Sequence, residues 1–134
     1  MGLFSNIFSL SGAKELNQAA NAVVHVRMLL DEYERGNDFD FLCAAAWIAQ
    51  VGFLDVVERN NWPMHYSLVA IINGHPTRMT IAEAMLQTST RIMTKAQHLT
   101  SKELKFIEEI FDKGEAFYKI EQNMPRKIVD LFKK

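Results

Sequence analysis

The sequence predicts an all-α, single-domain helical bundle of five or six helices around a central apolar helix. Three observations favour this class. Apolar side chains recur at three- and four-residue steps, two threonines stand three residues ahead of a glutamate, and a long apolar segment lies mid-chain. The chain has 134 residues, 49% of them hydrophobic, which is enough for one core without disulfide or metal support. We expect one domain over 1–134.

The first predicted helix covers 12–35. Leu16, Val23 and Leu30 lie near one face at helical spacing, and Gly36 is a suitable stop. The second and central helix is predicted over about 39–59, with an acidic start at Asp38 that suits the positive end of the helix dipole.

The apolar segment of the central helix runs from Phe41 to Val57. Gln50 and Asp55 interrupt it before it reaches the roughly 20 residues that span a bilayer. Nearly every face of this helix is apolar, so neighbours must cover it on most sides. We predict a buried core helix, covered by the helices at 80–98 and 100–123.

The segment 63–81 has two interpretations. Pro63 suits a first helical turn and Gly74 suits the position after a helix C-cap, which favours a helix. Asn73-Gly74 between apolar runs is also a strong hairpin signal, and the alternative is a short β-hairpin near 66–80. Because Pro76 would remove a ladder donor beside the turn, we predict the helix.

Two capping boxes mark the later helix starts. Thr80 precedes Glu83, and Thr100 precedes Glu103, each by three residues. They predict helices over about 80–98 and 100–123. Pro125 then ends the second of these, and 126–134 forms a short C-terminal helix.

Composition excludes several function classes. The 16 acidic and 15 basic residues leave a net charge of −1, so no global field attracts nucleic acid or membrane. The one cysteine, Cys43, has apolar neighbours, which predicts a buried, inert thiol in a reducing, cytoplasmic setting. No secretory signal is expected.

Catalytic and metal-binding motifs are absent from the sequence. There is no Gly-x-Ser-x-Gly elbow, Walker A loop or Gly-x-Gly-x-x-Gly turn, and no Cys-x-x-Cys pair. No histidine has a carboxylate three or four residues away. We therefore expect no metal, no cofactor and no enzyme activity.

Two groups of residues are candidates for binding a protein partner. The first contains aromatic and polar side chains on and near the segment "INGHPTRM", of types enriched at interfaces: Trp62, His65, Tyr66, His75 and Arg78. The second is an acidic cluster that would face a basic partner: Asp31, Glu32, Glu34, Asp38 and Asp40. Ordinary loop and solvated-turn roles are the alternatives for both.

The first eleven residues form an apolar N-terminal arm. It lacks the Ser or Thr that myristoylation requires at position six, and no basic residue precedes Lys14, which disfavours a membrane role. We expect it to pack on this chain or on a second copy, so that the protein self-associates. The side chains concerned are Leu3, Phe4, Ile7 and Phe8.

These patterns predict a non-enzymatic protein-interaction module, such as an inhibitor, immunity or adaptor protein that occludes a partner surface. One alternative is a small-molecule-binding protein or enzyme with a site around the 73–78 loop. Another is a small nucleic-acid-binding regulator that uses the basic C-terminal helix, although the acidic residues before it disfavour phosphate binding.

Overall fold

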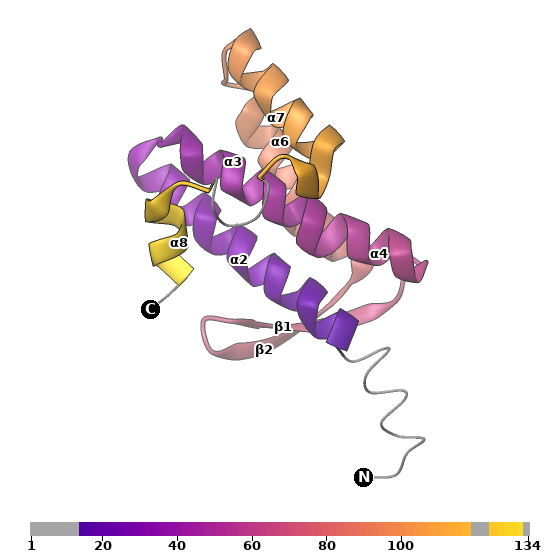
Figure 1. Cartoon of the computed structure of the whole chain (residues 1–134). Helices are drawn as coiled ribbons and strands as arrows, with labels where there is room; N and C mark the ends of the chain where they lie inside the picture. Colours follow the sequence, from indigo (N-terminus) through magenta and orange to yellow (C-terminus); the bar gives the residue numbers. More distant parts are fainter. Residues whose placement is uncertain (1–13, 119–123, 133–134) are drawn as a thin grey trace, which may run out of the picture.

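A computed structural model describes residues 14–118 and 124–132, and the N-terminal arm lies outside them. The described chain is mostly helical, with one two-stranded antiparallel sheet (Figure 1). The first described helix, α2, spans Lys14–Gly36. Asn37 then takes a left-handed conformation with φ of 54°, which turns the chain into the central helix.

The central helix is one continuous run of three parts. They are α3 (Phe39–Ile48), a π-helical turn η2 (Ala49–Leu54) and α4 (Asp55–Asn60). Asp38 is its N-cap, because the Asp38 carboxylate accepts a hydrogen bond from the Asp40 N–H at 3.1 Å. The predicted bounds of this helix are therefore confirmed to within one residue.

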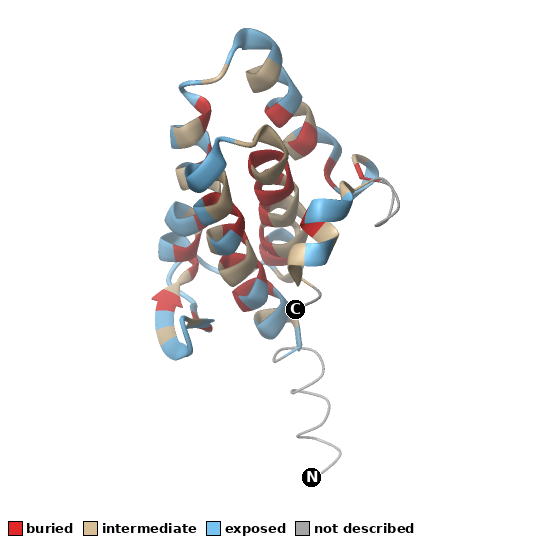
Figure 2. Ribbon diagram, turned by 90° about the vertical axis from the view of Figure 1, so that its left-hand side faces the viewer, coloured by how far each residue is buried: buried red, intermediate tan, exposed pale blue. Residues whose placement is uncertain are grey.

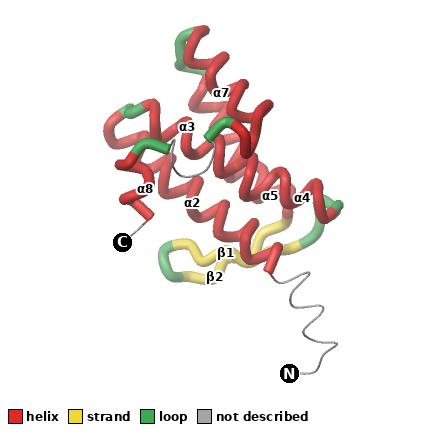
Figure 3. Tube along the Cα trace, in the orientation of Figure 1, coloured by secondary structure: helices red, strands yellow, loops and turns green. Residues whose placement is uncertain are grey.

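The prediction of a helix over 63–81 is wrong, and the alternative hairpin is present (Figure 3). Strand β1 spans Ser67–Ile72 and strand β2 spans His75–Thr80. The two turn residues, Asn73 and Gly74, have φ of 52° and 80°, as a type I′ turn requires.

The register shows why Pro76 does not weaken the hairpin. Ile72 pairs with His75 beside the turn, and Ile71 pairs with Pro76. In a hairpin with a two-residue loop, the pair next to the loop exchanges hydrogen bonds and the following pair does not. The Pro76 nitrogen therefore faces away from β1, and no ladder bond is lost.

Both predicted capping boxes are confirmed. The Thr80 hydroxyl accepts from the Glu83 N–H at 3.1 Å, and the Thr100 hydroxyl accepts from the Glu103 N–H at 3.2 Å. The first box starts a run made of α5 (Ile81–Met85), a π-helical turn η3 (Leu86–Thr90) and α6 (Arg91–Ala96). The second box starts α7 (Ser101–Lys113).

The helix predicted to reach residue 123 is shorter. Helix α7 ends at Lys113, because Gly114 has φ of 54°, and a single 3₁₀ turn η4 (Gly114–Ala116) follows. The last described helix, α8 (Arg126–Phe132), confirms a short C-terminal helix.

Figure 2 shows buried residues gathered where the helices pack against one another. The core has two parts, which share the central helix. One surrounds α3, which contacts α2, α6, α7 and α8; α2, rather than the predicted pair of later helices, is its main cover. Cys43 lies here at 1% exposure, and burial raises the pKa of its thiol to about 12, as expected for an inert cysteine. The other part, around Phe53, lies between α2, α4 and the hairpin.

Substitution of Gly52 tests the packing between α2 and η2. A methyl group added at Gly52 would lie 2.9 Å from Ala22 Cβ, closer than two such carbons pack. We expect Gly52→Ala to lower the free energy of unfolding by about 1–3 kcal/mol. Gly36→Ala is the control, because nothing lies within 4 Å of that position; it should stabilise by about 0.4–1 kcal/mol. Equal effects in denaturant unfolding would contradict this packing.

Candidate interaction surface

The most exposed apolar side chains near the hairpin lie on its outward side and on the loop before it. Val69 is 44% exposed and Ile71 is 53% exposed, although both sit in a regular strand. Met64 and Tyr66, which precede β1, are 45% and 41% exposed. We define the hairpin surface by the following residues: Met64, Tyr66, Val69, Ile71, Pro76 and Arg78.

The strand register explains why these side chains share one side. Val69 pairs with Arg78 and Ile71 pairs with Pro76, so these four side chains project from the same face of the sheet. The opposite face carries Leu68, which is buried against the cluster around Phe53. The hairpin is thus anchored by its inner face, and its outer face has apolar residues where water would normally favour polar ones.

The hairpin surface is positively charged through Arg78. From Asn60 to Ala82 the sequence contains no Asp, Glu or Lys, and Arg78 is its one fully charged side chain. Within the described residues, Arg78 makes no ion pair. An unpaired guanidinium beside exposed apolar side chains is complementary to a carboxylate on an apolar partner surface.

The sequence-predicted residues of this region are brought together in part. The rings of Trp62 and Tyr66 lie 5.9 Å apart, and Trp62 packs against the buried cluster while Tyr66 stays exposed. His65 is exposed on the same loop. His75 pairs with Ile72, at a register position whose side chains face opposite to that of Arg78. His75 and Arg78 therefore do not converge on one small-molecule site.

The acidic cluster lies at the other end of α2, away from the hairpin (Figure 1). Cations distant in sequence contact it. Arg91 lies 3.9 Å from Asp31 and 3.5 Å from Glu34, and Lys95 also pairs with Glu34. Glu32 pairs with Arg35. With Lys127 included, four cations contact the five carboxylates, which removes most of the field that would attract a basic partner.

Lys127 of α8 joins this cluster to the C-terminal helix. Its ammonium lies 2.6 Å from Asp38 Oδ2 and 2.9 Å from Asp40 Oδ2. Arg126 lies 3.9 Å from Asp130 on the same helix. The cations of α8 that the structure describes are thus paired with carboxylates, which gives no support to phosphate binding by this helix.

These contacts predict how α8 responds to pH. Lys127 lowers the pKa of the Asp38 carboxyl, and the carboxylates raise the pKa of Lys127. The Asp38 contribution is therefore present above its unfolded pKa of about 3.9 and is lost as the pH falls through the lower folded value. The Lys127 contribution is present below its unfolded pKa of about 10.4 and is lost as the pH rises through the higher folded value.

We expect the methyl resonances of Ile128, the buried anchor of α8, to stay constant between about pH 4 and 10 and to move below and above that window. The variant Lys127→Met should lose this dependence. The same pH dependence in the variant would show that another group controls the position of α8.

Two further features bear on function. Among the described residues, no three His, Cys, Asp or Glu side chains gather as a metal site. The run Phe39–Asn60 is long and apolar enough to cross a membrane, with mean hydropathy 1.6, but half of its most apolar window is buried in the protein. A core helix has the same properties.

In comparisons with known proteins, no family model, curated protein or solved structure matches the chain.

Proposed function

We propose that the chain is a non-enzymatic protein-interaction module that binds a partner protein through the hairpin surface. The observation that carries this proposal is the outer face of the hairpin, where Val69 and Ile71 are 44% and 53% exposed in a regular strand. Exposed apolar residues grouped in this way are typical of binding sites.

The composition of the surface supports a protein partner. Tyrosine, tryptophan, methionine and arginine are enriched at the centres of interfaces, whereas lysine and the acidic residues are depleted. Tyr66, Met64 and Arg78 match the enriched types. The ring of the half-buried Trp62 lies 5.9 Å from the Tyr66 ring. The depleted types do not occur from Asn60 to Ala82.

The partner surface is expected to be apolar and to carry a carboxylate opposite Arg78. This differs from the basic partner expected for the acidic cluster, because the cluster carboxylates already contact cations of this chain whereas Arg78 is unpaired within the described residues. Such a module acts by occlusion: its hairpin covers a surface that the partner needs.

Edge-to-edge strand pairing is a weaker binding mode for the outer edge of β2. Pro76 has no N–H to offer there, and the Thr80 N–H already donates to Glu83 Oε1 at 3.0 Å. The side chains of the hairpin surface, rather than the backbone of β2, therefore provide the contact.

The test begins with affinity purification of the tagged chain from its native host and identification of the bound protein. That protein is then purified and titrated by calorimetry against wild type, Ile71→Asp, Arg78→Glu and the control Leu86→Asp. Leu86 is 60% exposed on η3, outside the hairpin, so its variant controls for placing a carboxylate at an exposed apolar position.

We expect Ile71→Asp to weaken binding about hundredfold, or about 2.7 kcal/mol, and Arg78→Glu to weaken it about tenfold. The Leu86→Asp variant should bind like wild type. Unchanged affinity for Ile71→Asp, or an equal loss for Leu86→Asp, would overturn the proposal.

A further inference from the structure

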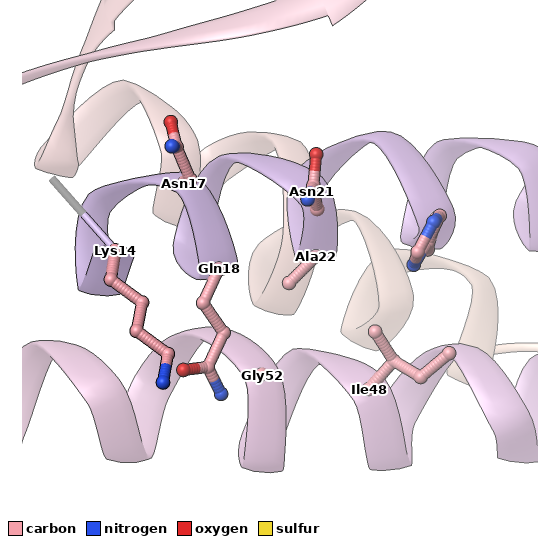
Figure 4. Close-up of a pocket in the computed structure, with 8 residues that line it drawn as sticks. Lys14, Asn17, Gln18, Asn21, Ala22, Ile48 and Gly52 are labelled. Atoms are coloured by element: carbon pink, nitrogen blue, oxygen red, sulfur yellow. The ribbon is translucent and has the colours of Figure 1, made fainter.

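A surface groove runs between α2 and the central helix, and its lining shares no residue with the hairpin surface (Figure 4). Its volume is about 480 Å³, within the range of small-molecule sites. In Figure 4, Lys14 and Gln18 extend from α2 toward the helix that carries Gly52, and Ile48 points back toward α2. Asn17 and Asn21 point from α2 away from the helix that carries Gly52.

Close packing at one point defines the groove. Gly52 and Ala22 meet where the two helices approach, and only a glycine leaves room there. Gly52 lies in the π-helical turn η2, and such turns occur frequently at functional sites.

The described lining residues are rich in hydrogen-bonding groups and include no carboxylate. They carry one ammonium, three carboxamides, of which that of Gln18 extends toward the central helix in Figure 4, and one imidazole, together with three apolar residues. Within the described residues, Lys14 makes no ion pair, and no side-chain hydrogen bond involves Gln18 or His25. Toward the part of the chain that the structure describes, these groups therefore keep their hydrogen-bonding capacity for a ligand.

His25 forms the far end of this lining. Its ring packs against Phe132 of α8, with the centroids 4.7 Å apart, so the imidazole is held in one place. Burial lowers the pKa of His25, which keeps the ring neutral near pH 7 and leaves it one donor and one acceptor. A neutral ring beside Ile48 suits the less polar part of a ligand.

We propose that this groove binds a small organic oxyanion, with its carboxylate or phosphate group at Lys14 and its carbon framework along Gln18 toward His25. Among the described lining residues the ammonium supplies the one full charge, and the neighbouring Glu15 carboxylate, which interacts with Lys14, is already bound by Arg59 and Asn60. The Gln18 carboxamide can donate to an anionic oxygen or to a hydroxyl group, and Ala22, Ile48 and Gly52 provide an apolar floor.

The test is a titration of the ¹⁵N-labelled chain with succinate and with inorganic phosphate, followed by the side-chain amide resonances of Gln18, which lies one helical turn from Lys14. We expect saturable shifts with a dissociation constant near 1 mM, an affinity of about 4.1 kcal/mol. A stronger response to succinate identifies a carboxylate ligand, and a stronger response to phosphate identifies a phosphorylated one.

Lys14→Met and Gln18→Ala should each weaken binding about tenfold while thermal unfolding stays unchanged. The matched control is Lys105→Met with Gln97→Ala, which removes the same groups from exposed positions on α7 and after α6. Shifts that do not saturate, or an unchanged affinity in Lys14→Met, would overturn the site. Neither result bears on the hairpin surface.

Discussion

Trp47→Ala should lower the free energy of unfolding by about 3–5 kcal/mol. Trp47 lies on the central helix, packs against the core around α3, and contacts the edge of the Tyr118 ring at a centroid distance of 5.6 Å. Its indole Nε1 donates to the Gly114 carbonyl at 3.0 Å, so the substitution removes both packing and a long-range hydrogen bond. Denaturant unfolding followed by far-ultraviolet circular dichroism measures the change.

Trp47→Phe separates these two contributions. The phenyl ring keeps much of the packing but cannot donate to Gly114. We expect the lost hydrogen bond to lower the free energy of unfolding by about 1–1.5 kcal/mol, in addition to the effect of the smaller ring. A loss below about 1 kcal/mol for Trp47→Ala would show that the indole does not join α7 to the central helix.

The sequence predicted the helical elements well because their signals are local. Each capping box needs only a threonine and a glutamate three residues apart, and both boxes form as expected. The apolar run of the central helix likewise predicts burial without knowledge of its neighbours. The end of α7 was missed because helical periodicity continues through Phe117, whereas the backbone turns at Gly114.

The sequence favours the helix over the alternative hairpin because the effect of Pro76 depends on register. A proline removes a ladder bond only where its nitrogen faces the partner strand, and the distance from the turn decides which way it faces. With the two-residue turn at Asn73 and Gly74, position 76 faces outward. The β-rich run Ser67–Ile72 favours the hairpin in the sequence as well, and its buried Leu68 and Ala70 alternate with exposed Val69 and Ile71 in the structure.

In the candidate sites too, features that depend on residue type could be predicted from the sequence, whereas features that depend on contacts between distant residues could not. Trp62, Tyr66 and Arg78 could be selected from sequence by residue type, but Val69 and Ile71 could not, since a strand face becomes visible only with the register. Conversely, the acidic cluster looked uncompensated because Arg91, Lys95 and Lys127 are distant in sequence from the carboxylates that they contact. The polar residues of the groove resemble an ordinary solvated helix face until Gly52 is placed opposite Ala22.

Phe53→Ala should lower the free energy of unfolding by about 3–5 kcal/mol, because Phe53 is fully buried at the centre of the cluster beneath the hairpin. The control is Phe106→Ala on α7, whose ring is 41% exposed and whose loss should be smaller.

The location of Phe53 beneath the hairpin also connects its packing to partner binding. Leu68, Ala70 and Met79, which anchor the inner face of the hairpin, belong to the same cluster, so the cavity left by Phe53→Ala weakens the support of β1 and β2 first. Hydrogen exchange should therefore show the largest increase at the strand amides and a smaller one in α7. Uniform loss of protection would mean that the hairpin unfolds only with the whole domain. A selective loss predicts that this variant also binds the partner more weakly, although no residue of the hairpin surface has changed.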